Sequence, residues 1–300
     1  MITGFSKTSL YLILVIICAV WVMDGLVDDW GRLSGSGENL IIFFRESLWP
    51  PNWSVIEPQA YPVCTAYPIF DFTCSTAWIG MVETIKIAFV STVLGTMVSL
   101  PIGILAARIL NSISVSYFAR FILAAARSLP SIIWAIFFVI LVGFGPLSGV
   151  LAMTIYTVGY LGKLQYESIE GMSSIPLEAS NSMGLSKLET AVGVVIPEQA
   201  NHLISQAIFM FEYNVRHGTV IGIVGAGGIG YYINLYLRFL QYDKVIAYLI
   251  IIFAVVLIID FLSIYARSFF SEESDVNRPS WWGIFLPADL ATKLAGNRQQ

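Results

Sequence analysis

The amino-acid sequence predicts an all-α integral membrane protein with about six transmembrane helices. Hydrophobic residues make up 57% of its 300 residues and charged residues only 12%, against roughly 45–50% and 25% in soluble domains. The mean hydropathy of +0.76 indicates the same fold class. A soluble protein with so few charges could not cover its surface, and 16 basic residues facing 20 acidic ones give no basic region for nucleic acid.

Six apolar stretches are predicted to cross the bilayer, because a spanning helix needs about 20 mostly apolar residues. They cover residues 8–23, 79–107, 121–142, 147–161, 200–213 and 245–265. The first is expected to be an uncleaved anchor, since no small-residue cleavage site follows it. The fourth and fifth are short for a complete crossing.

The segment 220–232 follows the fifth stretch and is apolar but rich in glycine. Its glycines are Gly222, Gly225, Gly227, Gly228 and Gly230. Glycine at this density makes a poor continuous helix, and irregular backbone at membrane depth persists only where protein or a cavity covers it. A broken or re-entrant element, packed against other helices, is therefore expected here.

The distribution of Lys and Arg predicts that both termini are cytoplasmic, because short cytoplasmic loops carry the excess of positive charge. The expected organisation is a first transmembrane helix (1–28), an outer loop (29–78), a transmembrane domain (79–270) and a cytoplasmic tail (271–300). Cys64 and Cys74 of the outer loop would face an oxidising compartment, where they could form a disulfide or remain two unpaired thiols.

The cytoplasmic loop 163–197 carries the first specific pattern. Pro176 suits the first turn of a short helix that the Ser173-Ser174 pair can cap, and Gly184 suits a left-handed turn before a second short segment. Glu178-Ala179-Ser180, then three residues, Gly184, nine residues and Val194-Val195-Ile196-Pro197 resembles the EAA loop of ABC-transporter permeases. The resemblance implies that Glu178, Ala179, Gly184 and Pro197 couple this chain to a separate ATPase.

A second pattern is similar to the phosphonate-type permeases. It runs from Phe211-Glu212-Tyr213-Asn214-Val215-Arg216 through Thr219 to the glycine-rich stretch that ends at Gly230. This resemblance implies a type I importer fold in a bacterial inner membrane, with a second copy of the chain, two ATPase subunits and an external solute-binding protein as partners. It also implies a phosphorus oxyanion as solute, no cofactor in this chain, and ATP with Mg²⁺ in the ATPase.

Four polar residues at membrane depth are candidates for the solute path, because a charge there costs about 2.5–3.5 kcal/mol on insertion scales and needs a reason. Arg127 could attract an oxyanion or bind helix carbonyls or a carboxylate. Arg216, with Asn214 and Glu212, could grip an anion, or Glu212 could pair with Arg216 and hold the break in shape. The amides near Gly225 to Gly230 could cradle an anion or serve close packing.

Other functional classes are disfavoured by the residues present. The chain has no G-x-x-x-x-G-K-[ST] loop, and its G-x-G-x-x-G match at Gly225–Gly230 lacks the acidic residue that a dinucleotide site needs. Three Cys and two His leave little for a metal site. The alternative is an ion-coupled secondary transporter of small anions, although the chain lacks paired broken segments in two halves. A membrane-embedded hydrolase is disfavoured as well, because the chain offers no credible pair of nucleophile and base.

Overall fold

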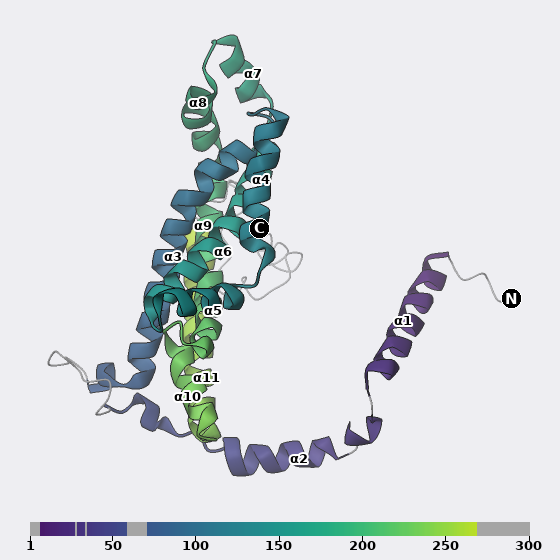
Figure 1. The fold of residues 1–300 in the computed structure, drawn as a ribbon, viewed down its shortest axis with the longest axis vertical. Coiled ribbons are helices and arrows are strands. Elements are labelled where there is room, and N and C mark those ends of the chain that lie inside the picture. Colours follow the sequence, from purple (N-terminus) through teal and green to yellow (C-terminus); the bar gives the residue numbers. More distant parts are fainter. Residues whose placement is uncertain (1–6, 28, 34, 59–70, 269–300) are drawn as a thin grey trace, which may run out of the picture.

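The computed structural model describes residues 7–27, 29–33, 35–58 and 71–268, and every regular element in these ranges is helical (Figure 1). The predicted all-α class is therefore confirmed. The longer helices are α1 (Lys7–Leu26), α3 (Thr76–Ala106), α4 (Ile113–Ser128), α5 (Ser131–Val142), α6 (Pro146–Glu170), α9 (Ile196–Ile221), α10 (Ile229–Arg238) and α11 (Tyr242–Ser268). The shorter α-helices are α2 (Ser36–Phe43), α7 (Ile175–Ser182) and α8 (Lys187–Thr190).

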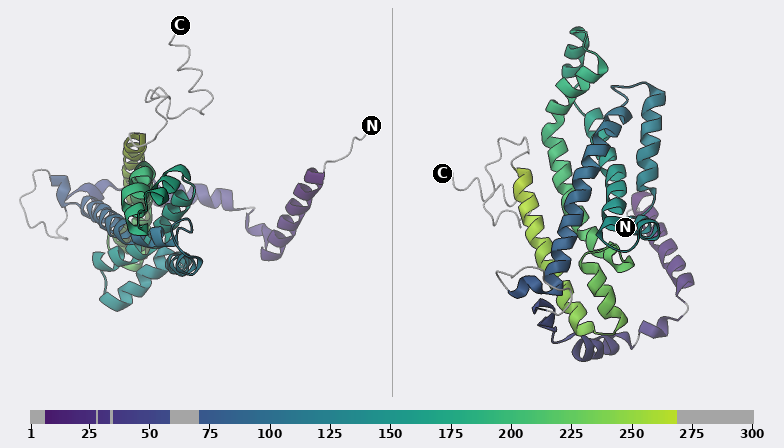
Figure 2. Two further views of the ribbon diagram at one scale, coloured as in Figure 1. Left: turned by 90° about the horizontal axis from the view of Figure 1, so that it is seen from above. Right: turned by 60° about the vertical axis from the view of Figure 1, so that its left-hand side comes forward.

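Helix α3 forms the centre of the bundle and packs along α4, α6, α9 and α10 (Figures 1 and 2). Small residues let the neighbouring backbones come close, as is usual between helices in membranes. A Cβ atom added at Gly95 would lie 2.3 Å from Cγ2 of Thr157 on α6, and one added at Gly80 would lie 2.9 Å from Cα of Ile229 on α10. Because these contacts are so close, they determine the positions at which α6 and α10 pack against α3.

The third predicted span is not one helix, which corrects the range 121–142. Helices α4 and α5 meet at an angle of 83°. The cause is local: Pro130 disfavours helical geometry in the residue before it, and Leu129 is extended, with φ −102° and ψ 139°. The break turns α5 across the middle of the bundle (Figure 1).

The fourth and fifth predicted spans are longer in the structure. Helix α6 has 25 residues and α9 has 26, and α9 continues from α8 through a π-helical segment, Ala191–Val195. The sequence understates both because their polar side chains turn inward; Gln165 and Gln199 are only 1% and 6% exposed. The loop between α6 and α8 is consequently shorter than the predicted 163–197.

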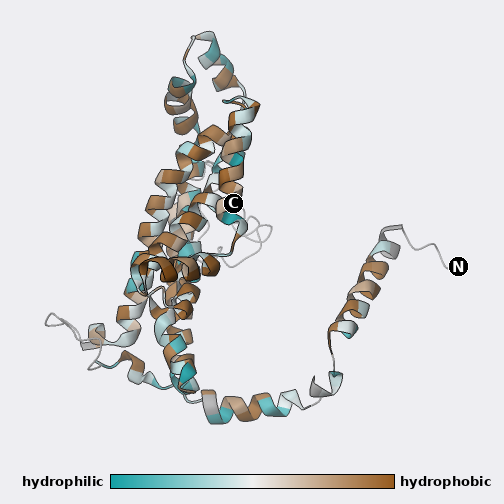
Figure 3. Cartoon of the chain, viewed as in Figure 1, coloured by the Kyte–Doolittle hydropathy of each residue, from teal (hydrophilic) through white to brown (hydrophobic). Residues whose placement is uncertain are grey.

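Among the residues that the structure describes, three helices are long and apolar enough to cross a membrane, namely α3, α6 and α11. The number rises to five if α4 with α5, and the run Lys187–Val224 with α10, each count as one bent span. The described part of α1 is a shorter apolar helix, Tyr11–Leu26. The helices of the bundle are rich in apolar residues (Figure 3), and many of their large apolar side chains are exposed, as a lipid-facing surface requires.

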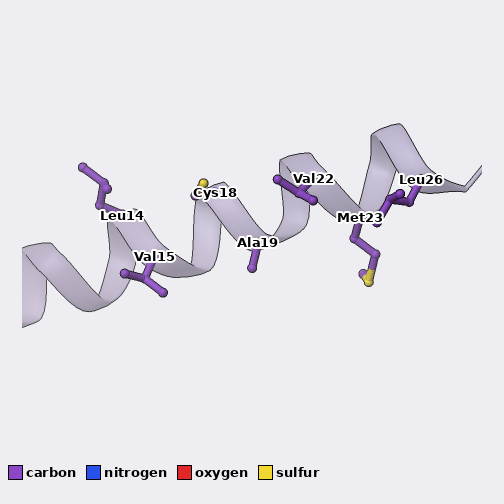
Figure 4. A pocket seen from close by; sticks show the side chains of 7 residues that line it. All are labelled: Leu14, Val15, Cys18, Ala19, Val22, Met23 and Leu26. Carbon is purple, nitrogen blue, oxygen red and sulfur yellow. The ribbon is translucent and has the colours of Figure 1, made fainter. Parts of the chain in front are cut away.

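Helix α1 lies apart from the bundle and is joined to it through α2, which extends sideways from one end of the bundle (Figures 1 and 2). Its described side chains from Tyr11 to Leu26 are exposed all round the helix. Leu14, Cys18 and Val22 follow one another at four-residue spacing along a shallow apolar surface (Figure 4). Such a surface is suited to lipid or to another apolar chain.

In the outer loop, Cys74 is buried and disulfide-bonded. Cys64 lies outside the described residues, so the pairing of Cys64 with Cys74 stays a prediction. The predicted tail 271–300 also lies outside them. The rest of the loop holds short helical turns and α2, which the sequence pattern did not predict.

Candidate functional site

The loop between α6 and α9 forms an arm at the end of the bundle opposite α2 (Figure 1). Glu178 and Ala179 are exposed on α7, and Pro197 lies in the first turn of α9. Large apolar side chains are also exposed here: Ile175 at 73%, Met183 at 67% and Leu188 at 74%. Exposed apolar groups gathered in this way mark a surface that another protein or a membrane covers.

The backbone of the arm is fixed by local hydrogen bonds and one glycine. Gly184 has φ +70°, the predicted left-handed turn, and nothing lies within 4 Å of a Cβ added there. Ser174 is the residue before α7, but its side chain does not cap the helix; its hydroxyl donates to Oε1 of Glu178 over 2.8 Å.

A capping box begins α8 outside the membrane-spanning part of α9. The Ser186 amide donates to Oε2 of Glu189 over 2.7 Å, and the Glu189 amide donates to the Ser186 hydroxyl over 3.4 Å. Hydrogen bonds from the Ser186 side chain and backbone hold the pKa of Glu189 below its usual value. The arm therefore starts its second helix at a defined residue.

Four charged residues between α9 and α11 form what is called here the charge cluster: Glu212, Arg216, Asp260 and Arg267. Arg216 Nη2 lies 2.5 Å from Glu212 Oε1 and 2.7 Å from Asp260 Oδ1. Arg267 Nη2 lies 3.2 Å from Glu212 Oε2. Two acids and two bases cancel, so Arg216 and Glu212 are engaged with each other rather than free for a solute.

Asn214 is fully buried and joins three helices. Its Nδ2 donates to Thr92 Oγ1 on α3 and to Thr157 Oγ1 on α6, each over 2.9 Å. Both amide protons of the side chain are thereby used. Asn214 acts as a hydrogen-bonded clamp between α3, α6 and α9, and its surroundings leave no room for it to contact a solute.

The glycine-rich segment is a tight turn between α9 and α10, which are bent by 41° across it. Gly225, Gly227 and Gly228 have φ of +89°, +83° and +76°, a conformation that glycine adopts at little cost. Gly222 and Gly230 lack space for a side chain, since an added Cβ would lie 2.6 Å from Gly227 O and 2.0 Å from Thr219 O respectively. The predicted broken element, covered by other helices, is confirmed.

Three amides of this turn, those of Gly225, Ala226 and Ile229, donate to protein atoms. Gly225 N donates to Gly222 O over 2.9 Å, Ala226 N donates to Ile221 O over 3.4 Å, and Ile229 N donates to Thr84 Oγ1 over 2.9 Å. Gly225 O accepts from Gly145 N at the start of α6. Of the two functions considered for these amides, close packing accounts for these bonds.

Arg127 lies in the last turn of α4, where the break with α5 begins. It is 14 residues from the start of α4 at Ile113, about 21 Å along a helix that rises 1.5 Å per residue. Its Nε is buried without a hydrogen-bond partner, and within the described residues its guanidinium makes no ion pair. Arg127 thus differs from Arg216 and Arg267, which both have carboxylate partners.

Aromatic side chains of α6 and α9 lie at the same level and form what is called here the tyrosine cluster: Tyr156, Tyr160, Tyr213 and His217. The Tyr213 ring stacks on His217 with centroids 4.0 Å apart, and on Tyr160 at 5.6 Å. The hydroxyls of Tyr156 and Tyr213 are 2.8 Å apart. All four side chains are half-buried in the single chain.

Within the described residues, no group of three or more His, Cys, Asp or Glu side chains is placed to hold a metal ion. What the bundle offers is an exposed arm, a helix break and a half-buried polar surface. These features are typical of a membrane transport subunit whose movement is driven by another subunit.

Comparison with known proteins decides the family. Residues 99–267 match the family described as binding-protein-dependent transport system inner membrane component. The chain belongs to this family. It is an inner-membrane, multi-pass permease subunit of an ABC importer and is not itself an enzyme. The predicted resemblance to ABC permeases is confirmed, and the assignment excludes the secondary-carrier and hydrolase interpretations.

Relatives with similar sequences are transport permeases. The permease is 37% identical over 258 residues to the phosphite transport system permease protein PtxC of Stutzerimonas stutzeri, which covers 85% of this chain and 86% of the relative. It is 36% identical over 202 residues to the phosphate-import permease protein PhnE of Mycolicibacterium smegmatis, covering 67% of this chain and 38% of that protein.

The fold of the permease is also similar to solved structures. The inward-facing MetNI methionine ABC transporter has a chain that superposes with a TM-score of 0.57 at 23% identity, covering 65% of this chain and 97% of that chain. At 23% identity the similarity shows the fold alone. It shows that about two thirds of this chain has the fold of that transporter chain.

The structure separates the four path candidates that the sequence put together. Glu212 and Arg216 belong to the charge cluster and Asn214 is a clamp, whereas the Nε of Arg127 is buried without a hydrogen-bond partner among the described residues. The sequence patterns did not single out Tyr156, Tyr213 and His217 as candidate site residues. A signal was present, because Gln199, Gln206 and Tyr213 recur every seven residues with His217 one turn further on, which puts a polar stripe on one face of α9.

Proposed function

We propose that the permease carries phosphite, a phosphonate or a related phosphorus oxyanion into the cell. The observation that carries this proposal is the 37% identity to a phosphite permease over 85% of the chain. The next relatives include a second phosphite permease and a phosphonate permease, at 38% and 39% identity. Relatives named for choline and carnitine transport are only 24% identical, so the shared sequence favours an anion.

The exposed arm is the proposed docking site for an ATPase subunit. Ile175, Met183 and Leu188 offer apolar contacts at its tip, and Glu178 and Ala179 lie on the same short helix as Ile175. Two short helices, joined by a left-handed glycine and with a capping box at the start of the second, are suited to pass on the movement of a partner as a rigid body. Pro197 lies further along the arm, where it begins α9.

One chain makes half of a path, so two copies are proposed to enclose it, with two ATPases at the arms and a solute-binding protein at the opposite end. This places the arms in the cytoplasm and α2 outside. Helix α1 runs from the end marked by α2 back toward the other end (Figure 1), which supports a cytoplasmic N-terminus. The positive residues near the arm, Arg108, Arg120, Lys163 and Lys187, support the same orientation.

Co-purification tests the docking. Wild-type permease, Gly184→Trp and Gly193→Trp are isolated from membranes with mild detergent and probed for an ATPase subunit. Gly184 needs a left-handed backbone, whereas Gly193 is helical and also open, with nothing within 4 Å of an added Cβ. The ATPase should accompany wild type and Gly193→Trp and be lost from Gly184→Trp. Equal recovery in all three preparations would remove the arm from the docking surface.

Uptake tests the substrate. A strain lacking the permease should lose phosphite or phosphonate uptake, and the wild-type gene should restore it. Uptake of choline is the matched negative control, given the lower identity to choline permeases. Restoration of choline uptake without any phosphorus oxyanion would contradict the proposed substrate.

A further inference from the structure

At the break between α4 and α5, Arg127 is a half-buried positive charge for which the described residues supply no carboxylate. The charge cluster is neutral by itself, and Arg120 pairs with Glu170 at 2.6 Å. Arg127 has no such partner among the described residues, and its Nε is buried. A guanidinium with a buried, unpartnered Nε carries a desolvation cost, which a visiting anion would offset.

The backbone of Arg127 packs closely against α6 at Gly159, next to two tyrosines of the cluster in the sequence. A Cβ added at Gly159 on α6 would lie 2.6 Å from Arg127 N and 2.9 Å from Arg127 Cβ. Gly159 stands directly before Tyr160 and one turn after Tyr156 in α6. The absence of a side chain at Gly159 therefore brings the start of the Arg127 side chain to the level of the two tyrosines.

Neutral side chains that can donate hydrogen bonds lie around Tyr156 of α6. Tyr156 and Tyr213 share a hydrogen bond between their hydroxyls at 2.8 Å, and either can be the donor. Ser131, the first residue of α5, has its hydroxyl 3.4 Å from His217 Nδ1. These hydroxyls and the imidazole bond to one another, and the hydroxyls can turn toward a ligand, since hydroxyl protons rotate.

We propose that Arg127, with Tyr156, Tyr213 and His217, forms a transient binding point for a tetrahedral oxyanion midway along the transport path. The guanidinium supplies charge and two parallel N–H groups, and the hydroxyls replace part of the hydration shell of the anion. The sharing of hydroxyls within the cluster keeps binding weak, because the solute must break internal hydrogen bonds to enter. This inference rests on the proposed function and identifies residues that would contact its substrate.

The test uses the complete transporter in proteoliposomes with its binding protein and phosphite as the probe, and measures phosphite transported and ATP hydrolysed. The variants are Arg127→Gln, Arg127→Lys and Tyr213→Phe, and Tyr231→Phe on α10, 46% exposed and outside the cluster, is the control. Arg127→Gln should transport about ten- to hundredfold less phosphite, the range expected when a hydrogen-bonded charge is lost. Its ATP hydrolysis, stimulated by loaded binding protein, should persist, so that phosphite moved per ATP falls.

The other variants complete the test. Arg127→Lys should keep part of the transport, and Tyr213→Phe, which keeps the ring stack, should lower phosphite moved per ATP several-fold while Tyr231→Phe leaves it unchanged. If Arg127→Gln does not assemble, Tyr213→Phe decides. Wild-type ratios in Tyr213→Phe or in an assembled Arg127→Gln would overturn the site although the transporter carries phosphite. A wild-type transporter that moves no phosphorus oxyanion would overturn the proposed function, and the site with it.

Discussion

Replacing Glu212 by Gln should destabilise the permease because it removes the negative charge that two arginines share. The Glu212 side chain is 8% exposed and lies 2.5 Å from Arg216 and 3.2 Å from Arg267. Removing one partner of a fully buried ion pair costs about 3–5 kcal/mol. Arg216 keeps Asp260 at 2.7 Å, and the two arginine side chains are 44% and 29% exposed, so solvent screens them in part. The expected loss of unfolding free energy is therefore about 2 kcal/mol.

The measurement is unfolding of the purified permease in mixed micelles, followed as a function of denaturing detergent. Glu212→Gln, Arg267→Gln and the double variant form a cycle, with Glu167→Gln as the control. Glu167 pairs with Lys163 at 3.4 Å on the exposed face of α6, so its loss should change stability by less than about 0.5 kcal/mol. The double variant should be more stable than the sum of the single losses predicts, by about 1 kcal/mol or more. Additive losses would refute the reasoning that the charge cluster acts as a unit.

Three further changes test other parts of the structure. Gly95→Ala should destabilise the α3–α6 contact by about 1–3 kcal/mol through overpacking against Thr157, whereas Gly37→Ala on α2, with open space around it, should not; detergent unfolding compares them. Asn214→Leu should cost about 1–3 kcal/mol, because Thr92 and Thr157 lose their buried partner, and unchanged stability would contradict the clamp. Glu189, whose pKa is lowered in the fold, stabilises the start of α8 above the ordinary carboxyl pKa of 4.5, and this contribution disappears as the pH falls through the lowered value. Amide exchange of Lys187–Thr190 should therefore be faster in Glu189→Gln than in wild type at pH 7, and the two proteins should exchange equally fast at low pH. Equal exchange rates in the two proteins at both pH values would contradict the stabilising role of Glu189.

The helical class and the break at the glycine-rich segment were predictable because both depend on local composition. Apolar stretches long enough for a bilayer leave few alternatives to helix, and the glycines from Gly222 to Gly230 cannot continue one. The left-handed turn at Gly184 was predictable for the same reason. These features follow from backbone conformation, which nearby residues decide.

The span boundaries were harder to predict because hydropathy does not distinguish a polar residue in a loop from one inside a bundle. Gln165 and Gln199 are buried, and they made α6 and α9 look shorter than they are. The bend at Pro130 was present in the sequence as a proline, but the apolar residues on both sides of it resemble one continuous span.

The path candidates could not be separated from the sequence, because their roles depend on contacts between distant segments. Arg127 and Arg216 are equivalent as intramembrane arginines. Asp260 and Arg267, which complete the charge cluster around Arg216, are 44 and 51 residues further along the chain, and Tyr156 meets Tyr213 across 57 residues. Only the packing of α6, α9 and α11 shows which arginine is already neutralised.

Reconstituted transport tests most directly whether this chain is the path of an ATP-driven importer for phosphorus oxyanions. Proteoliposomes holding the permease, its ATPase and the binding protein should accumulate phosphite only when ATP is present on the side of the arms and the loaded binding protein is on the side of α2. Gly184→Trp should abolish this accumulation, and Gly193→Trp should keep it. Accumulation that needs no ATPase and follows an imposed ion gradient would contradict the importer and the coupling arm alike.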